Sequence, residues 1–439
     1  MVFLNRFKEK NIAIYGMGLT GQSSAKKLIA MGANVFCWDD DKKTRKRSRE
    51  LKFKINKFWL EKKEFDNIIL SPGIDIEKCS IKRFLKKNSK KILTDLDLFF
   101  EINKDVDTIS ITGTNGKSTT CKLVEKILKF ANYSVITAGN IGKPILSLTN
   151  IKKNKILILE VSSYQLQYSK LFRSKHAAIL NISPDHLERH KNIKNYTIVK
   201  SKIFSSQNNL DYSYINSTNK HLKFLKKLFK NKKFKSKLNL VSESSCKSIL
   251  EKINNNYFKS KGNIENLAFA YKICKNFKIK NHIIIKALNK FKGLPHRQEK
   301  VFSKKKILCI NDSKATSFDA SLQSLSNYNK IYWILGGVPK YNDYFGLENV
   351  KKNIVKAYII GKNISFFEKK INKTIPFLKS YSMKNAINSI IRDLKENKKL
   401  NGTILLSPAG ASFDQFKNFE NRGNYFKKLI KKNLKKINV

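Results

Sequence analysis

Ile-Ser-Ile-Thr-Gly-Thr-Asn-Gly-Lys-Ser-Thr-Thr-Cys occupies residues 109–121 and is the most informative segment of this 439-residue chain. The β-branched run Thr108–Thr112 predicts a buried strand, and the residues Cys121–Phe130 predict a helix after it. Gly113 and Gly116 lie in the loop between them, where glycine lets backbone N–H groups turn inward around an anion. A phosphate-binding loop between a strand and a helix indicates an α/β fold that binds a nucleotide.

The two residues after the glycine-containing loop indicate that the ligand is a nucleoside triphosphate. Lys117 is placed to reach the β- and γ-phosphates, and Ser118 is placed to hold Mg²⁺ at the helix N-terminus. The strict phosphate-loop pattern is not met, because Ile111 stands where its first glycine should be. A glycine-rich helix cap with no ligand therefore remains the alternative to a triphosphate site.

The net charge of +56 is extreme, with 89 Lys and Arg residues against 33 Asp and Glu residues. Nucleic-acid-binding proteins gather such an excess on one face or tail. In this chain the lysines are spread over the whole length, so we expect solvated lysines on every surface and no nucleic-acid partner. The excess still favours anionic substrates, whose encounter it would speed at low salt. An NTP-driven nucleic-acid-binding protein is the alternative from another class.

The cysteines are scattered and form no C-x-x-C pair, which predicts reduced thiols rather than a disulfide frame or a metal site. They are Cys37, Cys79, Cys121, Cys246, Cys274 and Cys309. Residues 1–10 contain no apolar signal-peptide core, and no stretch approaches the length of a membrane span. We therefore expect a cytoplasmic protein with no stable membrane insertion.

Short β-branched runs alternate with helical stretches along the chain, which predicts βαβ units and parallel sheets. The expected strands are Asn11–Tyr15, Asn34–Trp38, Asn67–Leu70, Thr108–Thr112, Ile156–Val161, Ala177–Ile182, Lys306–Ile310, Ile331–Leu335, Ala357–Ile360 and Thr403–Leu406. Two breaks in this alternation suggest domain boundaries, one near Ile92 and one at Gly293–Arg297. The Lys/Asn-rich tract 208–260 predicts variable surface structure with some strand and helix.

Gly16-Met-Gly-Leu-Thr-Gly21 follows a predicted strand and opens a helix, and Asp39 and Asp40 lie about twenty residues further on. Alone, this dinucleotide fingerprint would predict an NAD-dependent dehydrogenase. The same glycine turn and helix N-terminus can receive any pyrophosphate. Because the chain contains a second phosphate loop, it is expected to bind two nucleotides.

Further polar residues follow the predicted strands, where parallel sheets form ligand clefts. Glu160 ends one strand and is expected to be either a Mg²⁺ ligand or a hydrogen-bonded structural carboxylate. His186 lies in the next such loop and is expected to be either a metal or substrate contact, or structural. Three late loops, 311–316, 336–340 and 407–414, each combine small residues with polar groups and are expected to rim a cleft.

Read together and in order, these segments resemble the Mur ligases of peptidoglycan synthesis over nearly the whole chain. The most specific matching segments are residues 16–21, 71–74, 113–118, 139–142, 294–297, 311–316 and 414–423. The last of these, Asp-Gln-Phe-Lys-Asn-Phe-Glu-Asn-Arg-Gly, is most similar to the D-glutamate-adding members. One departure is Gly262, where the family usually carries a histidine before its adenine-facing asparagines.

The resemblance implies three α/β domains: a Rossmann-like domain for the UDP-sugar (residues 1–93), a central ATPase domain with a parallel sheet (94–297) and a Rossmann-like amino-acid domain (298–439). It implies that ATP drives the joining of D-glutamate to UDP-N-acetylmuramoyl-L-alanine through an acyl phosphate, by a monomer acting on small molecules. The first glycine loop would then hold a UDP-sugar rather than NAD. Within this class, another Mur-type ligase or a folylpolyglutamate-type ligase is the alternative.

The resemblance also implies a role for each matching residue. The implied cofactors are ATP, two Mg²⁺ ions and a carbamoylated Lys200. The implied ATP site comprises Gly113, Thr114, Asn115, Gly116, Lys117, Ser118, Thr119, Asn263, Asn266, Arg297 and Asp312. The implied UDP-sugar site comprises Gly18, Leu19, Thr20, Asp39, Asp40, Ser71, Gly73, Asn140, Ser162 and His186. The implied D-glutamate site comprises Lys314, Thr316, Lys340, Ser412, Phe413 and Phe419. The implied metal ligands are Ser118, Glu160, His186 and Lys200, and the implied catalytic residues are Lys117, His186, Lys200 and Arg297.

Overall fold

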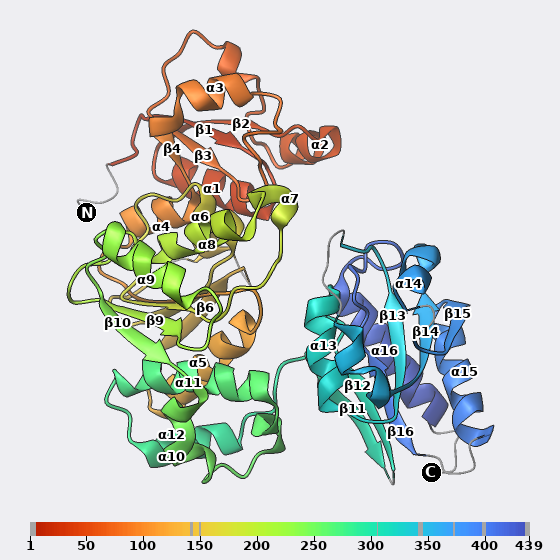
Figure 1. The fold of residues 1–439 in the computed structure, drawn as a ribbon. Helices are drawn as coiled ribbons and strands as arrows, with labels where there is room; N and C mark the ends of the chain where they lie inside the picture. Colours follow the sequence, from red (N-terminus) through yellow and green to blue (C-terminus); the bar gives the residue numbers. More distant parts are fainter. Residues whose placement is uncertain are drawn as a thin grey trace. The chain divides into compact units, whose positions relative to one another are not determined.

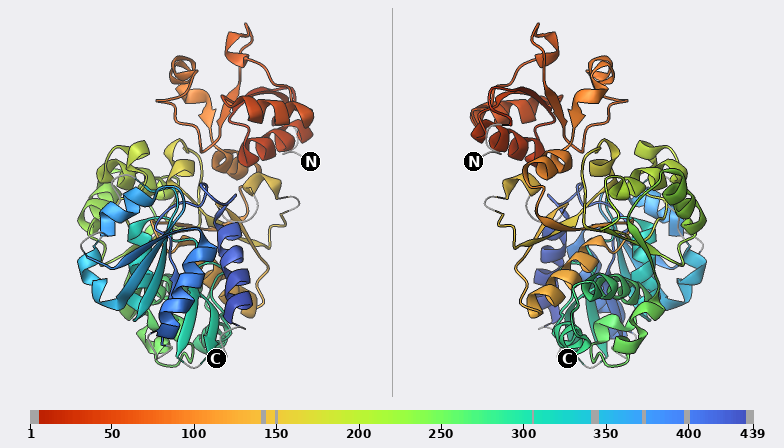
Figure 2. Two further views of the ribbon diagram at one scale, coloured as in Figure 1. Left: turned by 90° about the vertical axis from the view of Figure 1, so that its right-hand side faces the viewer. Right: turned by 90° about the vertical axis from the view of Figure 1, so that its left-hand side faces the viewer.

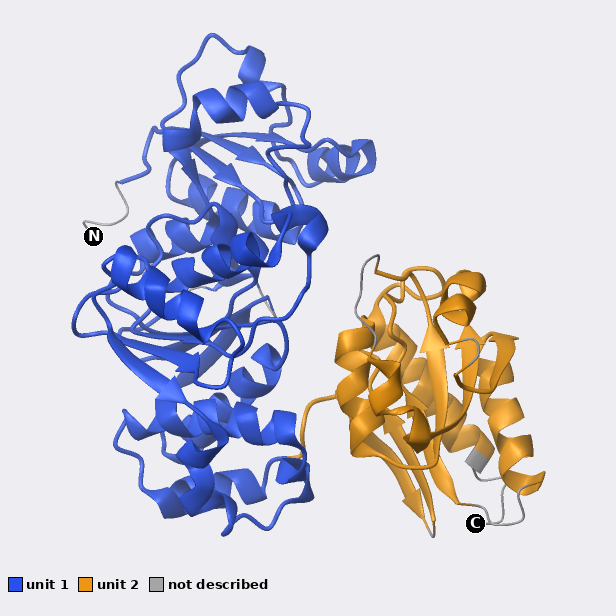
Figure 3. Cartoon of the chain, viewed as in Figure 1, with its two compact units in different colours: residues 1–291 blue, residues 292–439 orange. Residues whose placement is uncertain are grey.

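The computed structural model describes residues 6–140, 144–148, 151–304, 306–340, 346–371, 374–396 and 401–434. Ile141 and Gly142 of the 139–142 motif lie outside the described residues. The chain divides into two compact units, residues 1–291 and residues 292–439, which are coloured separately in Figure 3. The first unit contains two sheets and the second contains one, and the sheets follow one another in sequence order (Figure 1).

The first sheet has four parallel strands in the order β2-β1-β3-β4. Its strands are β1 (Asn11–Tyr15), β2 (Asn34–Trp38), β3 (Asn67–Leu70) and β4 (Ile92–Leu93). The elements between them are α1 (Leu19–Ala30), α2 (Lys42–Glu50), α3 (Lys82–Lys87) and the short 3₁₀ helices η1 (Phe58–Leu60) and η2 (Ser89–Lys91). Helix α4 (Asp95–Ile102) leads to the next sheet.

The second sheet has six parallel strands in the order β10-β9-β8-β5-β7-β6. Its strands are β5 (Asp107–Thr112), β6 (Val135–Gly139), β7 (Ile156–Glu160), β8 (His176–Ile179), β9 (Tyr212–Asn216) and β10 (Lys237–Val241). Its α-helices are α5 (Lys117–Phe130), α6 (Ser163–Gln167), α7 (Leu187–His190), α8 (Ile193–Ser201), α9 (Leu222–Asn231), α10 (Lys247–Leu250), α11 (Lys261–Lys275) and α12 (Asn281–Asn289). Its 3₁₀ helices are η3 (Ile145–Ser147), η4 (Lys202–Phe204), η5 (Glu243–Cys246) and η6 (Asn256–Lys259).

The third sheet has the order β11-β12-β16-β13-β14-β15 and is parallel except for its edge strand β11. Its strands are β11 (Glu299–Lys304), β12 (Ile307–Asn311), β13 (Ile331–Gly336), β14 (Ile354–Ile360), β15 (Phe377–Tyr381) and β16 (Gly402–Leu406). Its helices are α13 (Phe318–Asn327), α14 (Ile364–Ile371), α15 (Met383–Glu396), α16 (Phe419–Leu434), η7 (Leu347–Asn349) and η8 (Lys351–Asn353). Among the described residues, no helix combines the length and the apolar character needed to cross a membrane.

Each sheet is buried on both faces, as parallel sheets require. In β1, Ile12 and Ile14 join one hydrophobic core while Ala13 and Tyr15 join another, because successive strand residues point to opposite faces. The core that contains Ile12 continues through α4 and η3 into the second sheet. One shared core thus holds the first two sheets in a single unit, and Figure 2 shows the ribbon from two further sides.

All ten strands predicted from the sequence are present, three of them with the predicted bounds. The helix predicted over Cys121–Phe130 begins earlier, at Lys117. The predicted start was wrong because Gly116 (φ +84°) turns the chain directly into the helix, so residues 117–120 form its first turn. The strand predicted to reach Ile182 ends at Ile179, and the residues after it turn to contact the phosphate loop. The tract 208–260 contains β9, α9 and β10 and the short helices η5, α10 and η6.

Asp97 on α4 joins the linking helix to the second sheet's domain. Its Oδ1 accepts hydrogen bonds from the Ser169 hydroxyl (2.8 Å) and from the backbone N–H groups of residues 170–172 (2.8–3.1 Å). Its Oδ2 accepts from the backbone and hydroxyl of Thr94 (3.0 Å each), which closes a capping box. This buried carboxylate therefore satisfies donors from two segments far apart in the sequence.

We expect Asp97→Ala to lower the free energy of unfolding by about 3 kcal/mol, because several buried donors lose a charged acceptor at once. Chemical denaturation followed by tryptophan fluorescence would measure the change. Asp105→Ala is the matched control, since Asp105 is exposed and pairs only with Lys153 at the surface (2.8 Å). It should cost no more than about 1 kcal/mol. An equal effect of the two substitutions would contradict the role assigned to Asp97.

Candidate active site

The loop between β5 and α5 is shaped by two glycines. Gly113 has φ +157° and Gly116 has φ +84°, a left-handed conformation that strongly favours glycine. A Cβ atom on Gly116 would also lie 2.1 Å from Oδ1 of Asn266, so no larger residue fits. The Lys117 ammonium folds over this loop and donates to the carbonyl oxygens of Gly113 (2.8 Å) and Thr114 (2.7 Å). The predicted anion cradle and its lysine thus lie together at the N-terminus of α5.

A second loop, which follows β8, holds the phosphate loop from the side. The Asn181 side chain accepts from the Asn115 N–H (2.8 Å) and donates to the Asn115 carbonyl (3.1 Å). The Thr114 N–H donates to the Asn181 carbonyl (3.0 Å), and the Ser183 N–H donates to the Thr114 hydroxyl (3.0 Å). Sequence analysis missed Asn181, because nothing local distinguishes a bracing asparagine from any other loop asparagine.

Glu160 ends β7 and lies against the first turn of α5. Ser118 donates to its Oε2 (2.5 Å), and the Asn140 side chain donates to its Oε1 (2.8 Å). A hydroxyl in the first turn of α5 and a buried carboxylate at the end of β7 are oxygen donors of the kind that Mg²⁺ prefers. The described residues contain no group of three or more His, Cys, Asp or Glu side chains that would hold a metal alone. Mg²⁺ usually takes only one or two protein carboxylates and completes its shell with phosphates and water.

Lys200 projects from α8 to the same loop and is only 1% exposed. Its ammonium nitrogen lies 2.9 Å from the Gly113 carbonyl oxygen, which Lys117 also contacts, and 3.3 Å from the Thr112 hydroxyl. Burial holds the pKa of the Lys200 amine well below its usual range, and the charge of Lys117 lowers it further. The Lys200 amine beside the phosphate loop therefore loses its proton more readily than a lysine exposed to water.

His186 lies in the loop between β8 and α7, in a left-handed conformation (φ +54°). Its Nδ1 is 2.9 Å from the Tyr164 hydroxyl, and its Nε2 is 3.4 Å from a carboxylate oxygen of Asp185. About a third of its side chain is exposed. Both imidazole nitrogens thus have a neighbouring polar side chain, and part of the ring remains exposed to solvent.

The predicted adenosine contacts of the first unit lie on α11, which packs against α5. Asn266 accepts from the Thr120 hydroxyl (3.2 Å) and lies against Gly116. Asn263 donates to the Tyr257 carbonyl (2.8 Å). Asn263 and Asn266 are both buried, and the structure brings Asn266 to the phosphate loop. Gly262 lies in the first turn of this helix.

The first sheet carries the other predicted nucleotide loop, after β1. A Cβ atom on Gly21 would lie 1.9 Å from the Gly16 carbonyl oxygen, so the helix approaches the turn as closely as it can. The Ser71 hydroxyl donates to that same carbonyl (2.6 Å). Asp39 accepts from the Met17 N–H (2.6 Å) and so shapes the turn itself. Gly18 caps α1, and Leu19, at the start of the helix, is 71% exposed.

Two predicted UDP-sugar residues have clear structural partners. The Asp40 carboxylate accepts from the hydroxyls of Tyr15 and Ser80 (2.6 Å each), and these bonds lower its pKa against the opposing effect of burial. Ser162 is the N-cap of α6 and shares a capping box with Gln165. Thr20 lies in the first turn of α1, and Gly73 lies in the loop after β3.

The second unit gathers its predicted residues at one edge of the third sheet. Strands β12, β16 and β13 are parallel neighbours, so the loops after them meet at their carboxyl ends. The Asp312 N–H donates to the Leu406 carbonyl (2.7 Å), and the Gly336 N–H donates to the Pro408 carbonyl (2.8 Å). The three late loops predicted to rim a cleft are therefore side by side.

Asp312 is buried beside three donors. Its side chain accepts from the Gln298 N–H (3.2 Å) and from the hydroxyls of Ser324 and Ser407. Burial raises its pKa to about 6, while the nearby Arg297 guanidinium acts in the opposite direction. Arg297 and Asp312 both belong to the second unit, whereas the phosphate loop belongs to the first.

The predicted D-glutamate residues lie on these late loops and at the start of α16. The Lys314 ammonium lies 3.8 Å from the centre of the Phe419 ring. Ser412 is buried and Phe413 is 74% exposed. Thr316 and Lys340 are half-buried, in the loops after β12 and β13.

Sequence analysis missed the central role of Arg422, a fully buried residue of α16. Its guanidinium donates to the hydroxyl (3.0 Å) and carbonyl (2.9 Å) of Ser313 and to the carbonyl of Gly336 (3.4 Å). Burial lowers its pKa to about 10. Arg422 thus ties α16 to two of the three late loops, and only its place in the C-terminal motif pointed to it.

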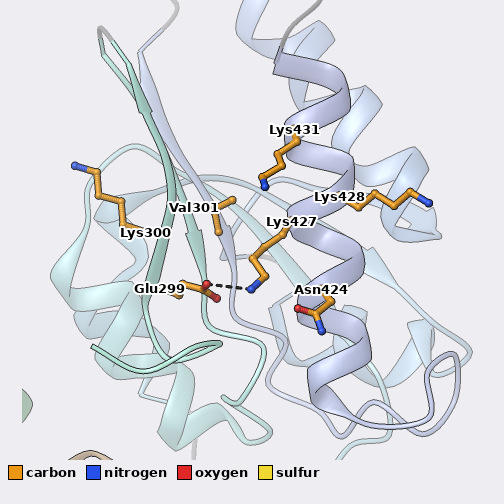
Figure 4. A pocket seen from close by; sticks show the side chains of 7 residues that line it. All are labelled: Glu299, Lys300, Val301, Asn424, Lys427, Lys428 and Lys431. Atoms are coloured by element: carbon orange, nitrogen blue, oxygen red, sulfur yellow. Dashed lines mark hydrogen bonds and ion pairs between the residues drawn. The ribbon is translucent and has the colours of Figure 1, made fainter. Parts of the chain in front are cut away.

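A hollow of about 530 Å³ in the second unit is a different feature (Figure 4). It lies between β11 and α16, and Lys427 pairs there with Glu299 (3.0 Å). Lys300, Lys428 and Lys431 also line it. In a chain with 89 Lys and Arg residues, lysines on an exposed helix face are expected from composition. None of the predicted site residues lines this hollow.

Comparison with known proteins agrees with this geometry. The Mur ligase middle domain family matches residues 111–288. The UDP-N-acetylmuramoylalanine--D-glutamate ligase of Rickettsia bellii is 34% identical, over 96% of this chain and 97% of its own length. The ligase of that name from Rickettsia felis is also 34% identical (99% and 100%), and the one from Novosphingobium aromaticivorans is 30% identical (98% and 96%).

Solved structures agree at the level of the fold. The MurF ligase of Thermotoga maritima in complex with ADP superposes with a TM-score of 0.56 at 15% identity, over 98% of this chain and 96% of that one. The UDP-N-acetylmuramate-alanine ligase MurC of the same organism gives 0.53 at 14% identity, over 97% and 99%. The three sheets and the phosphate loop agree with full-length relatives that are more than 30% identical. The chain therefore belongs to the Mur ligase family.

Proposed function

We propose that this chain joins D-glutamate to UDP-N-acetylmuramoyl-L-alanine with the hydrolysis of ATP to ADP and phosphate, in peptidoglycan synthesis. One observation carries the proposal: the relatives that match the chain from end to end are named UDP-N-acetylmuramoylalanine--D-glutamate ligase. The phosphate loop and the separate glycine turn of the first sheet supply the two anion sites that such a reaction needs. The substrates are small molecules, and we propose a cytoplasmic monomer.

The chemistry explains why ATP is needed. A carboxylate is a poor acyl donor, because oxide is a poor leaving group. Attack of the substrate carboxylate on the γ-phosphate forms an acyl phosphate and releases ADP. The amine of D-glutamate then adds to the acyl carbon and loses a proton. The tetrahedral intermediate collapses to the amide and releases inorganic phosphate.

The first barrier is electrostatic, since one anion must approach another. Lys117 lies over the phosphate loop, where its positive charge would offset the negative charge of the β- and γ-phosphates. The family resemblance implies the same role for Arg297. Ser118 and Glu160 would hold one Mg²⁺, and His186 with modified Lys200 would hold a second. When bound, these ions would neutralise part of the phosphate charge.

Modification of Lys200 is part of the proposal. Its buried amine, with a pKa well below the usual range, has the free electron pair that attacks CO₂ to form a carbamate and release a proton. The product is an oxygen-donor anion in place of a cation next to Lys117, so it relieves the repulsion between two lysines that share the Gly113 carbonyl. Because carbamate formation releases a proton, the modified fraction should rise with pH.

The remaining substrate contacts follow the loops. The Gly16–Gly21 turn, the Ser71–Ile74 turn, Asn140 and Ser162 would face the UDP-sugar. Asn263, Asn266 and Asp312 would hold the adenosine. The late loops of the second unit, with Lys314, Thr316, Lys340, Ser412, Phe413 and Phe419, would hold D-glutamate.

We expect the purified protein to release phosphate from ATP only when UDP-N-acetylmuramoyl-L-alanine and D-glutamate are both present. A coupled phosphate assay with single substrates omitted measures this, and a panel of amino acids that includes L-glutamate defines the specificity. Lys117→Ala serves as the blank and should lower kcat by at least about 10²-fold, because the phosphates lose a charge that water cannot replace. Release with another amino acid and none with D-glutamate would contradict the assignment, as would stimulation by DNA.

We expect Lys340→Ala to raise the KM for D-glutamate by at least about tenfold, the loss expected for a charged hydrogen bond to a carboxylate. The KM values for ATP and for the UDP-sugar should change by less than about twofold. Steady-state kinetics with each substrate varied in turn measures the three values, and Lys369→Ala on the exposed face of α14 is the control. Equal effects on all three would mean that Lys340 does not recognise the amino acid.

We expect Lys200→Ala to be about 10³-fold less active and to be partly rescued by acetate or formate, which replace the missing carboxylate. Native mass spectrometry at neutral pH should find one bound CO₂ in the wild type and none in this variant. Lys194→Ala, on the exposed side of the same helix, should keep full activity. Full activity of Lys200→Ala would rule out the carbamate.

A further inference from the structure

Arg189 lies on the short helix α7, three residues after His186, and its side chain is only 7% exposed. No role for it follows from the sequence pattern. Its guanidinium sits over the rings of Tyr164 and Tyr168, with its central carbon 5.3 and 5.7 Å from the ring centres. A buried arginine with its plane set against two aromatic rings has few orientations open to it.

The guanidinium reaches from the second sheet's domain to a loop of the first sheet. One nitrogen donates to the backbone carbonyl of Ile74, which is 115 residues away in the sequence. Another donates to the Gln167 side chain (2.6 Å), and the third lies 3.9 Å from a carboxylate oxygen of Asp75. Tyr168 strengthens the same connection, because its hydroxyl accepts from the Ile76 N–H (3.2 Å).

The Ile74 end of this connection leads to the first glycine turn. The Ile74 N–H donates to the Ser71 carbonyl (3.0 Å), and the Ser71 hydroxyl donates to the Gly16 carbonyl (2.6 Å). A Cβ atom on Gly16 would lie 2.9 Å from the Ile74 side chain, so the two turns are in full contact. A shift of the Ile74 carbonyl would therefore move the anion-binding turn that begins at Gly16.

The other end leads to His186. The Arg189 and His190 N–H groups both donate to the His186 carbonyl (3.0 Å each). Tyr164, which lies under the guanidinium, holds the His186 imidazole through its hydroxyl (2.9 Å). Arg189 is thus the side chain that contacts both the loop of the first sheet and the residues that orient His186.

We propose that Arg189 is a positioning residue that holds the Ser71–Ile74 turn and the His186 loop in register, and so sets the affinity for the UDP-sugar. The inference rests on the proposed function and on the UDP-sugar contacts that the family resemblance implies for Ser71, Gly73 and His186. The printed partners of this guanidinium, Ile74, Gln167 and Asp75, lie outside the phosphate loop, so the KM for ATP should not depend on it. A lysine cannot replace it, because one ammonium cannot reach three acceptors in a plane.

The experiment compares Arg189→Lys and Arg189→Met with the wild type. Both variants should raise the KM and the calorimetric Kd for the UDP-sugar by about tenfold, while the KM for ATP stays within about twofold. Arg189→Ala should recover part of its affinity in millimolar guanidinium, because Arg189 borders a hollow of about 330 Å³ through which the ion can enter.

Tyr168→Phe removes only the acceptor for the Ile76 N–H and should raise the KM for the UDP-sugar by about threefold. If Arg189→Met fails to fold, Tyr168→Phe provides the test.

Arg173→Met is the matched control, since Arg173 is also an arginine of the first unit and pairs with buried Asp211 (2.8 and 3.0 Å). It should lower the melting temperature and leave every KM unchanged. Arg189 variants that lower the melting temperature without a selective change for the UDP-sugar would overturn the inference. A wild-type protein that shows no D-glutamate-dependent phosphate release would instead overturn the proposed function, so the two failures are distinguishable.

Discussion

The carbonyl oxygen of Gly113 accepts hydrogen bonds from the side chains of both Lys117 and Lys200, and the central site depends on this concentration of basic groups. Burial lowers the pKa of the Lys200 amine, and the nearby charge of Lys117 lowers it further. Phosphate on the loop or a carbamate on Lys200 would each relieve the repulsion. Glu160 lies near the same loop through Ser118, so the site combines opposite charges that a nucleotide and a metal can share.

All three sheets present polar groups at the carboxyl ends of their parallel strands. Parallel strands align their carboxyl ends, so loops far apart in the sequence meet at one edge. In the second sheet this brings together the loops after β5, β7 and β8, and in the third sheet those after β12, β13 and β16. Each loop supplies only one or two polar side chains. The chemistry therefore depends on the strand order, which sets which loops are neighbours.

Buried polar groups outside the catalytic loops hold the first unit together. Asp97 satisfies four donors of residues 169–172, and Arg189 satisfies the Ile74 carbonyl and the Gln167 side chain. Both lie where segments of the first and second sheets meet, and a continuous hydrophobic core runs beneath. Such contacts are directional, whereas apolar packing is not. They can therefore keep loops of the first two sheets in a defined relation that the core alone would leave loose.

The sequence alone was sufficient for the α/β class, ten strands, the phosphate loop and the family, because these depend on residue spacing over short distances and on the order of motifs. It also named Glu160 and Lys200, whose positions follow from strand ends and the family pattern. The bracing of the phosphate loop by Asn181 and the contacts of Arg189 and Arg422 were decided only by the tertiary structure. Each of these contacts joins residues tens to more than a hundred positions apart. Local periodicity cannot reveal such partners, since burial and hydrogen bonding at these sites are set by which strands become neighbours in the folded sheet.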